Sequence, residues 1–516
     1  MSDKKRLIIT IVSMLILVVG VTFAYFIPQI GGGVLRKLNL VADTPDDLQF
    51  IGGGIKLKLT QFNLAQGGEN LSNSTYVSAV LKANSTTNTA TYTYNVYFNV
   101  KSNNFIYTTT EKKAEIILKV LDPNGNEITT LDGLPYLDGS TTNGVSGFDI
   151  TTLNGLKTIA ENYTITSNSS NDYNYQDWNF SVTFINLDTN QVENEGKELK
   201  AEIIMQQDKL LTTLDEVCTN GDNLTNCITT LSQKSISGAT NIYYHDSNLE
   251  NGAGDNSYRY AGANPNNFVC FGSTESPCPT DNLYRIIGVI GGKVKLIKYD
   301  YANSNLLGTD GDYYHGTTPP DGSYYKGKLT SVNTYYWNYK ASNNSSNTWS
   351  TSLLNKTNLN TNFINNIGAT WANKIETTTW KVGGNTEANI GGAVPSVAYK
   401  NEITTPAENT TYDAKIGLIY TSDYGFAASP SAWTTNLSSY DSSSITSVNW
   451  MYMGVQEWTI SHCSDDSSSV FCVYRYGSLY GNNASSARGV RPSFNLTSST
   501  SYVSGSGSMS DPIIIN

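Results

Sequence analysis

The sequence predicts a β-rich protein with several domains, an antiparallel β-sandwich followed by an α+β domain. Its 516 residues exceed what one hydrophobic core usually holds. Strand-like segments separated by polar turns recur along the first half of the chain, which is typical of a sandwich. Charged residues make up only 15% of the chain, against about a quarter in an average protein. Asn, Ser, Thr, Gly and Tyr take their place, a composition found in secreted bacterial β-proteins and in tyrosine-rich binding surfaces.

Residues 1–27 predict a transmembrane anchor or a signal peptide. The uncharged apolar run 7–27 is about long enough to span a bilayer as a helix. The basic residues Lys4, Lys5 and Arg6 stand before this run. This order favours an N-terminus on the inner side of the membrane, with the rest of the chain outside the cell. Cleavage after Ala24 is the alternative, because Thr22 and Ala24 are small residues near the end of the run. We therefore expect the protein at the extracellular face of the membrane, or secreted if cleavage occurs.

A Gly-bearing stalk is expected at 28–54 and the β-sandwich at 55–208. The segment "ATYTYNVYFNV" (90–100) alternates strongly, as a half-buried strand does, and "ELKAEIIMQ" predicts a further strand that ends near Gln206. The segment "DPNGN" predicts a turn with another strand after it; it lacks the full ligand spacing of a calcium loop. The "TFAYF" end of the apolar run resembles the signal segment of camelysin- and TasA-type bacterial matrix proteins. That resemblance implies a structural fibre or matrix role as one alternative.

A helical connector is expected at 209–235 and the α+β domain at 236–516. The segment "NLYRIIGVIGGKVKLIKYD" predicts a hairpin around Gly291 and Gly292, because two β-branched runs flank the glycine pair. The segment "NTWSTSLLNKTNLNTNFINNI" predicts a helix. The segment "AKIGLIYTSDYGFA" predicts a strand, and "GVRPSFNL" and "DPIIIN" predict closing strands.

Six cysteines fall into three local pairs, which predicts three small disulfide-closed loops in an oxidising compartment. The pairs are Cys218 with Cys227, Cys270 with Cys278, and Cys463 with Cys472. Zinc sites use closer cysteine spacing with histidines nearby, and only His462 among the three histidines adjoins a cysteine. No metal site is therefore expected from the cysteines. No cofactor is expected; calcium at Asp310 and Asp312, in "GTDGDYYHG", is the alternative to a solvated turn, which is the simpler interpretation.

Two short motifs carry a second resemblance. Several segments between 242 and 516, including "LYRIIGVI", "TWSTSLLN" and "GVRPSFNL", resemble a large family of uncharacterised bacterial surface proteins. The pieces "GVQEWT", with Gly454, Glu457 and Trp458, and "GVRPSF", with Gly489 and Arg491, resemble the formylglycine-generating-enzyme branch of the C-type-lectin fold. Val490 stands where that branch has an aromatic residue.

From the residues themselves, we expect Glu457, Trp458 and Arg491 to be structural. Trp458 should fill the core, and Glu457 should pair with Arg491 or accept from backbone donors. The resemblance also implies an enzyme with reactive cysteines and copper as a further alternative. Reactive thiolates need electropositive surroundings, which Asp465 and Asp466 oppose beside Cys463. No catalytic residue is therefore predicted.

The segment "VYRYGSLYGNNASSAR" (473–488) is the predicted ligand-binding loop. Tyrosine offers a large contact area at low entropic cost, while Ser, Gly and Asn adapt hydrogen bonds to the ligand. The resemblance to C-type-lectin folds implies a ligand surface in this stretch as well. The candidate residues are Tyr474, Arg475, Tyr476, Tyr480, Asn482, Asn483 and Arg488.

These observations predict an adhesin-like protein whose C-terminal domain meets an external glycan or protein ligand. Its other expected partner is the membrane, through the N-terminal helix. Nucleic acid is excluded as a partner, because the net charge is −11 and no basic stripe exists to neutralise phosphates. The alternatives are the fibre or matrix component and the extracellular enzyme named above.

Overall fold

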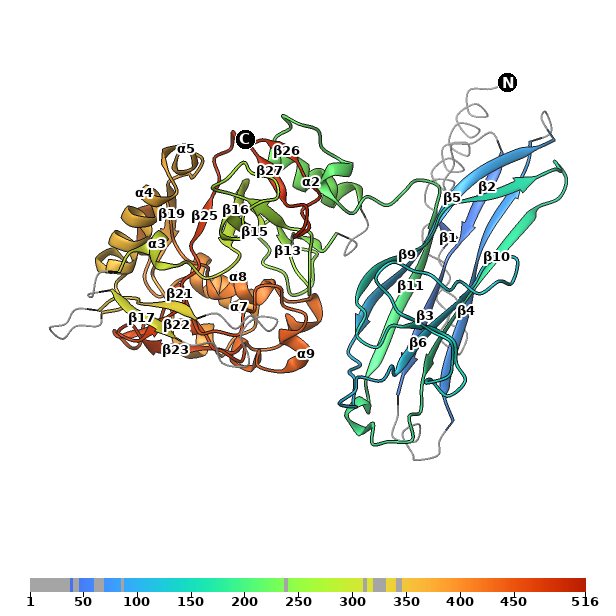
Figure 1. Cartoon of the computed structure of the whole chain (residues 1–516), viewed down its shortest axis with the longest axis horizontal. Coiled ribbons are helices and arrows are strands. Elements are labelled where there is room, and N and C mark those ends of the chain that lie inside the picture. Colours follow the sequence, from blue (N-terminus) through green and yellow to red (C-terminus); the bar gives the residue numbers. More distant parts are fainter. Residues whose placement is uncertain are drawn as a thin grey trace, which may run out of the picture. The chain divides into compact units, whose positions relative to one another are not determined.

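The structure, a computed structural model, contains two compact units. The N-terminal unit is Met1–Lys209 and the C-terminal unit is Leu210–Asn516; both are coloured along the chain in Figure 1. The described residues are 38–39, 46–59, 69–84, 88–235, 240–309, 313–318, 331–339 and 346–516.

The described part of the N-terminal unit is a sandwich of two antiparallel sheets (Figure 1). The first sheet has the order β1 (Leu38–Asn39), β2 (Asp47–Ile51), β4 (Leu71–Lys82), β10 (Asn174–Phe184), β6 (Ile116–Leu121), β8 (Gly147–Asp149) and β7 (Tyr136–Leu137). The second has the order β3 (Gly53–Lys58), β11 (Glu198–Gln206), β5 (Ala90–Asn103) and β9 (Gly155–Ser167). This confirms the predicted β-sandwich, including the strand that ends at Gln206.

The core of this unit lies between the two sheets. Alternation along β5 directs Tyr94, Val96 and Phe98 into it, where Phe98 stacks on Phe180 of the other sheet with ring centroids 6.1 Å apart. The buried Trp178 indole donates to the Tyr94 hydroxyl at 2.9 Å, so the largest side chain of this core also has its polar atom satisfied.

Two sequence expectations for this unit need correction. The sandwich begins before residue 55, because β2 and β3 start at Asp47 and Gly53 and pair with β4 and β11. The turn at 122–126 forms, with Asp122 accepting from the backbone N–H groups of Asn124 and Asn126. The strand expected after this turn does not form. Glu127 makes only an isolated bridge to Leu121.

The C-terminal unit contains one large sheet and three small ones in its described residues. The large sheet has the order β12 (Ile242–His245), β13 (Ser257–Tyr260), β15 (Leu283–Ile290), β14 (Phe268–Cys270), β27 (Ile513–Ile515) and β26 (Tyr502–Ser504), with β16 (Lys293–Lys298) between β15 and β25 (Ser493–Asn495). The small sheets are β17 (Tyr314–Thr318), β18 (Val332–Tyr336) and β24 (Ala487–Arg488); β19 (Thr378–Lys381) and β20 (Thr411–Ala414); and β21 (Glu457–His462), β22 (Ser469–Val473) and β23 (Leu479–Asn483). The predicted hairpin is β15–β16, and the closing strands are β25 and β27.

The helices of the C-terminal unit are short. The α-helices are α2 (Leu224–Lys234), α3 (Ser304–Leu307), α4 (Ile364–Asn366), α5 (Ala369–Ala372), α6 (Glu387–Ile390), α7 (Pro395–Tyr399), α8 (Thr421–Phe426) and α9 (Ser443–Thr446). Two π-helices, η7 (Leu354–Phe363) and η8 (Lys400–Thr404), accompany them. The helix predicted within 347–367 is therefore present as a 3₁₀ turn at Trp349–Thr351, followed by η7 and α4.

Of the connector expected at 209–235, residues 210–235 belong to the C-terminal unit and do not form a separate connector. Leu224, Ile228 and Leu231 of α2 are buried in the same core cluster as Ile286 and Leu296 of the large sheet. Only α2 and the short 3₁₀ turn Leu214–Glu216 are helical in this segment. Burial against the sheet decides where the segment belongs.

In the segment 414–427, where a strand was expected, only Ala414 lies in a named strand, and most of the second half is a helix. The strand β20 ends at Ala414, and α8 begins at Thr421. The Asp423 carboxylate accepts from the Tyr420 backbone N–H at 3.0 Å, one half of a capping box that starts a helix. The capping Asp423 therefore starts a helix at Thr421, where the β-branched run before it predicted a continuing strand.

Within the described ranges, no helix is both long and apolar enough to cross a membrane. The anchor or signal segment expected at 1–27 lies outside these ranges, as does most of the stalk expected at 28–54.

Candidate functional site: a tyrosine-rich surface and a buried charge network

Two of the three predicted disulfides are confirmed. Cys218 and Cys227 are bonded, with Cα atoms 5.7 Å apart, and Cys270 and Cys278 are bonded, with Cα atoms 5.8 Å apart. Within the described ranges, Cys218, Cys227 and Asp222 also form a group of potential metal ligands. Because both sulfurs are joined in the disulfide, this group lacks the thiolates that a metal would need.

The third predicted disulfide is wrong: Cys463 and Cys472 are free and buried. In the hairpin formed by β21 and β22, Cys472 of β22 lies opposite Trp458 of β21, whereas Cys463 follows the end of β21. Their side chains enter different core clusters, Cys463 with Phe471 and Leu479, and Cys472 with Trp458 and Ala484. Local spacing suggested a loop closure, but strand register separates the two thiols.

Burial raises the pKa of both free thiols. The nearby Glu387 carboxylate adds to the rise for Cys463, and the pKa of Cys472 reaches about 12. Both thiols are therefore protonated at neutral pH and lack the thiolate that cysteine chemistry requires.

Glu457 and Arg491 form the expected buried pair. Arg491 donates from Nε to one carboxylate oxygen at 2.6 Å and from Nη2 to the other at 2.5 Å, and each side chain is 2% exposed. Nη2 also donates to the Met451 carbonyl at 2.7 Å. Trp458 is buried, and its indole donates to the Tyr335 carbonyl at 2.9 Å. These residues join β21, β18 and the segment before β25, which is a structural role.

The predicted binding residues Tyr474, Arg475, Tyr476 and Tyr480 lie together, and we call them the tyrosine surface. Tyr474 makes edge contacts with Tyr476 and Tyr480, with ring centroids 5.3 and 5.1 Å apart. The Arg475 guanidinium lies 4.7 Å from the Tyr476 ring centroid. Tyr476 is 47% exposed, so the surface presents an aromatic face next to a cation.

Of the other predicted residues, Arg488 lines and Asn483 supports an adjacent pocket of about 460 Å³, which we call the serine pocket. It is lined by His315, Tyr336, Ser485, Ser486, Ala487 and Arg488. The Asn483 side chain accepts from the backbone and the hydroxyl of Ser485, at 2.9 and 2.6 Å, and so fixes the turn between β23 and β24. The Asn482 amide donates weakly to the Tyr480 hydroxyl at 3.5 Å.

Arg488 connects the two features. Its guanidinium lines the serine pocket and interacts with the Cys472 thiol, which Tyr480 of the tyrosine surface also contacts. The pocket side is built by β17, β18 and β24, which pair in that order, and the tyrosine side carries Tyr480 on β23, which pairs with β22. The sequence did not indicate His315 or Tyr336, because they come from β17 and β18, far from the loop in the chain. Asp310 and Asp312, the possible calcium ligands, lie outside the described residues.

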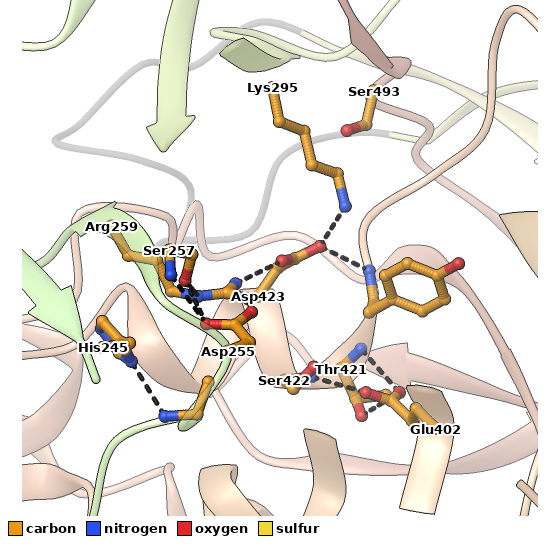
Figure 2. Close-up of polar contacts among 12 residues, drawn as sticks. His245, Asp255, Ser257, Arg259, Lys295, Glu402, Thr421, Ser422, Asp423 and Ser493 are labelled. Carbon is orange, nitrogen blue, oxygen red and sulfur yellow. Dashed lines mark hydrogen bonds and ion pairs between the residues drawn. The ribbon is translucent and has the colours of Figure 1, made fainter. Parts of the chain in front are cut away.

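A buried charge network, which sequence reasoning missed, is the second notable cluster (Figure 2). Its centre is Asp423 on α8, whose Oδ1 accepts from Arg259 Nη1 at 3.1 Å and whose Oδ2 accepts from Lys295 Nζ at 2.6 Å. Arg259 Nη2 also donates to Asp255 at 2.8 Å. We call Asp255, Arg259, Lys295 and Asp423 the Asp423 network.

Burial and charge act together on these groups. Burial lowers the pKa of Lys295, although the Asp423 carboxylate opposes this. For Asp423, burial would raise the pKa, but Lys295 and Arg259 hold it below its ordinary value. Burial likewise opposes ionisation of Asp255, yet Arg259 and Ser257 bring its pKa down to about 2. Because Lys295 alternates with the core residues Val294 and Leu296, the pattern predicts an exposed lysine and contains no signal for this cluster.

Glu402 and His245 border the network. Glu402, on η8, accepts from the backbone N–H groups of Thr421 and Ser422, at 2.9 and 3.1 Å, at the start of α8, and burial raises its pKa. His245 Nδ1 accepts from the Ala253 N–H at 3.0 Å, and its Nε2 has no hydrogen-bond partner among the described residues. Burial lowers the pKa of His245 to about 3, so the ring is neutral.

Comparison of the chain with models of protein families, with curated proteins and with solved structures gave no match.

Proposed function

We propose that the chain is an adhesin-like bacterial binding protein, displayed at the cell surface or secreted, whose C-terminal unit binds an external glycan or protein. The observation that carries this proposal is the tyrosine surface: Tyr474 contacts the rings of both Tyr476 and Tyr480, and Tyr476 is 47% exposed beside Arg475. Flat aromatic faces stack on sugar rings and on apolar parts of proteins, and they lose little entropy on binding.

The serine pocket supports the same proposal. It offers hydroxyls, an imidazole and a guanidinium next to the aromatic surface, the mixture of apolar and directed polar groups by which ligand sites fix orientation. The two short motifs that resemble the C-type-lectin branch also lie together in the fold. Glu457 pairs with Gly489 in a parallel bridge, which brings the two short motifs side by side. In this interpretation the C-terminal unit is lectin-like, and residues 1–27 direct the chain to the outside of the cell.

The test is a glycan and matrix-protein array probed with the full chain. The binding variant changes Tyr474, Tyr476 and Tyr480 to Ala together. The matched control is Tyr244→Ala, which removes a 40% exposed tyrosine of the same unit that stacks on Tyr258 with centroids 4.6 Å apart. Retention on the array that is lost in the triple variant and kept in the control supports the proposal. Equal retention of all three proteins, or of none, contradicts it.

A further inference from the structure

We propose that Lys295 and Asp423 condense to an amide, which cross-links β16 to α8 within the C-terminal unit. The two reacting groups already touch, with Lys295 Nζ 2.6 Å from Asp423 Oδ2. Both are almost fully buried, with side chains 5% and 3% exposed. A nucleophile and an electrophile held in contact gain an effective concentration of roughly 10⁵ M or more over free reactants.

The surroundings hold the carboxyl group in place through both oxygens. Arg259 Nη1 donates to Oδ1 at 3.1 Å, and the Tyr420 backbone N–H donates to Oδ2 at 3.0 Å. The Arg259 donor stabilises the negative charge that develops on Oδ1 when the amine attacks the carboxyl carbon, and the Tyr420 N–H orients the leaving oxygen Oδ2. Figure 2 shows Arg259 and Lys295 approaching Asp423 from different sides.

Aromatic side chains cover the amine. Lys295 Nζ lies 4.7 Å from the Tyr420 ring centroid and 5.3 Å from that of Trp380. With these rings over it and both partners buried, the pair is shielded from bulk water, which would otherwise favour hydrolysis of the product.

The reaction needs no other reactant. The Lys295 ammonium first gives a proton to the Asp423 carboxylate, which leaves a neutral amine and a carboxylic acid. The amine lone pair then attacks the Asp423 carboxyl carbon and forms the C–N bond. The carbon–Oδ2 bond breaks, and Oδ2 leaves as water after taking a second proton from the nitrogen. The products are one neutral secondary amide and one water molecule, and no oxidant or reductant takes part.

The charge balance of the interior favours this product. The reaction replaces a buried cation and a buried anion, both costly to desolvate, by a neutral amide. Arg259 then remains paired with Asp255, at 2.8 Å, so no buried charge is left alone. The lowered pKa of Lys295 eases the first proton transfer, whereas the lowered pKa of Asp423 opposes it. The ion pair is therefore the resting state from which a slow reaction proceeds.

The intact mass of the reduced, full-length chain tests the proposal directly. We expect a mass lower than that of the sequence by one water. After denaturation and trypsin digestion, we expect residues 294–298, uncut at Lys295, joined to residues 416–475, because an acylated lysine is not cleaved. A linked fraction that grows while the folded protein is incubated supports the proposal. Recovery of the free peptides 294–295 and 416–475 alone after long incubation overturns it, as does a missing water located at other residues.

Variants assign the bond. Lys295→Met should abolish the linked peptide. Lys298→Met is the matched control, because Lys298 is a buried lysine of the same strand that donates to the Asp281 carbonyl at 2.8 Å. It should keep the link. A link that persists in Lys295→Met would overturn the assignment, and the wild-type mass decides the question even if a variant fails to fold.

Discussion

The two units place their ion pairs differently. In the described part of the N-terminal unit, the paired side chains keep at least 22% of their exposure; the pairs are Lys56–Glu198, Lys101–Glu202, Lys119–Glu127, Lys200–Glu198 and Lys209–Glu161. In the C-terminal unit, Asp423 and Glu457 and their cationic partners are at most 5% exposed, although Lys293–Glu376 is an exposed pair there as well.

This difference bears on the surface that we propose for ligand binding. The N-terminal unit keeps the partners of these ion pairs partly in water, where each pair contributes little to stability. The C-terminal unit withdraws arginine and lysine side chains into its core, where they join strands and helices from distant parts of the chain. Its tyrosine surface then meets solvent through aromatic rings and neutral polar groups, with Arg475 stacked on Tyr476.

The strongest way to break the comparison is to remove one partner of a buried pair. Arg491→Met should lower the free energy of unfolding of the C-terminal unit by about 3–5 kcal/mol, because Glu457 would be left buried without a cation. Urea unfolding followed by tryptophan fluorescence measures this unit selectively, since every tryptophan except Trp178 lies beyond residue 209. A loss below about 1 kcal/mol would contradict the structural role of this pair.

The neutral His245 predicts a pH dependence confined to the C-terminal unit. Its pKa in the folded chain is about 3, against 6.5 ordinarily, so the unfolded chain binds the proton first as pH falls. The stability is full above pH 6.5 and declines toward pH 3, by about 4 kcal/mol at about pH 3.5. His245→Phe should flatten this decline, whereas the change of exposed His315 to Gln should leave it intact. An unchanged slope in His245→Phe would show that another group titrates.

Asp255 predicts a second pH dependence of stability in the C-terminal unit, at lower pH than that of His245. Arg259 and Ser257 help to hold its pKa at about 2 against burial, below the ordinary 3.8, so its contribution is present above pH 3.8 and is lost as pH falls through 2. Asp255→Asn should therefore cost ~2 kcal/mol of unfolding free energy at neutral pH and almost nothing near pH 2. A cost that stays constant with pH would show that shape, and not charge, decides this position.

The smallest effect is expected for a surface pair of the N-terminal unit. Lys101→Met removes the 2.6 Å contact with Glu202, whose side chains are 41% and 34% exposed. The free energy of unfolding should change by only about 0–1 kcal/mol, because both charges are already hydrated. A loss as large as that expected for Arg491→Met would remove the distinction between the two units.

Sequence reasoning predicted the features that depend on neighbours in the chain. The alternation at 90–100 predicted β5, the Gly291–Gly292 pair predicted the β15–β16 turn, and close spacing predicted two disulfides. It failed for Cys463 and Cys472 because strand register, which the spacing does not contain, puts them in different core clusters.

The site residues follow the same rule: those close in sequence were predicted, and those brought together by the fold were not. Tyr474, Tyr476 and Tyr480 were predicted together because they are close in sequence. His315 and Tyr336 reach the serine pocket only through the pairing of β18 with β24. The partners in the Asp423 network are even more distant, since Lys295 and Asp423 stand 128 residues apart. Glu457 and Arg491 were an exception, because short motifs drew attention to both residues.

The central claim is that the tyrosine surface binds the ligand, and single-variant affinities test it most directly. For whichever array component retains the full chain, the dissociation constant would be measured for wild type, Tyr476→Ala and Tyr244→Ala. We predict that Tyr476→Ala weakens binding by roughly 10-fold or more, as expected for a central aromatic contact, and that Tyr244→Ala leaves it unchanged. Equal affinities for wild type and Tyr476→Ala, both folded, would contradict the account and move the binding site elsewhere.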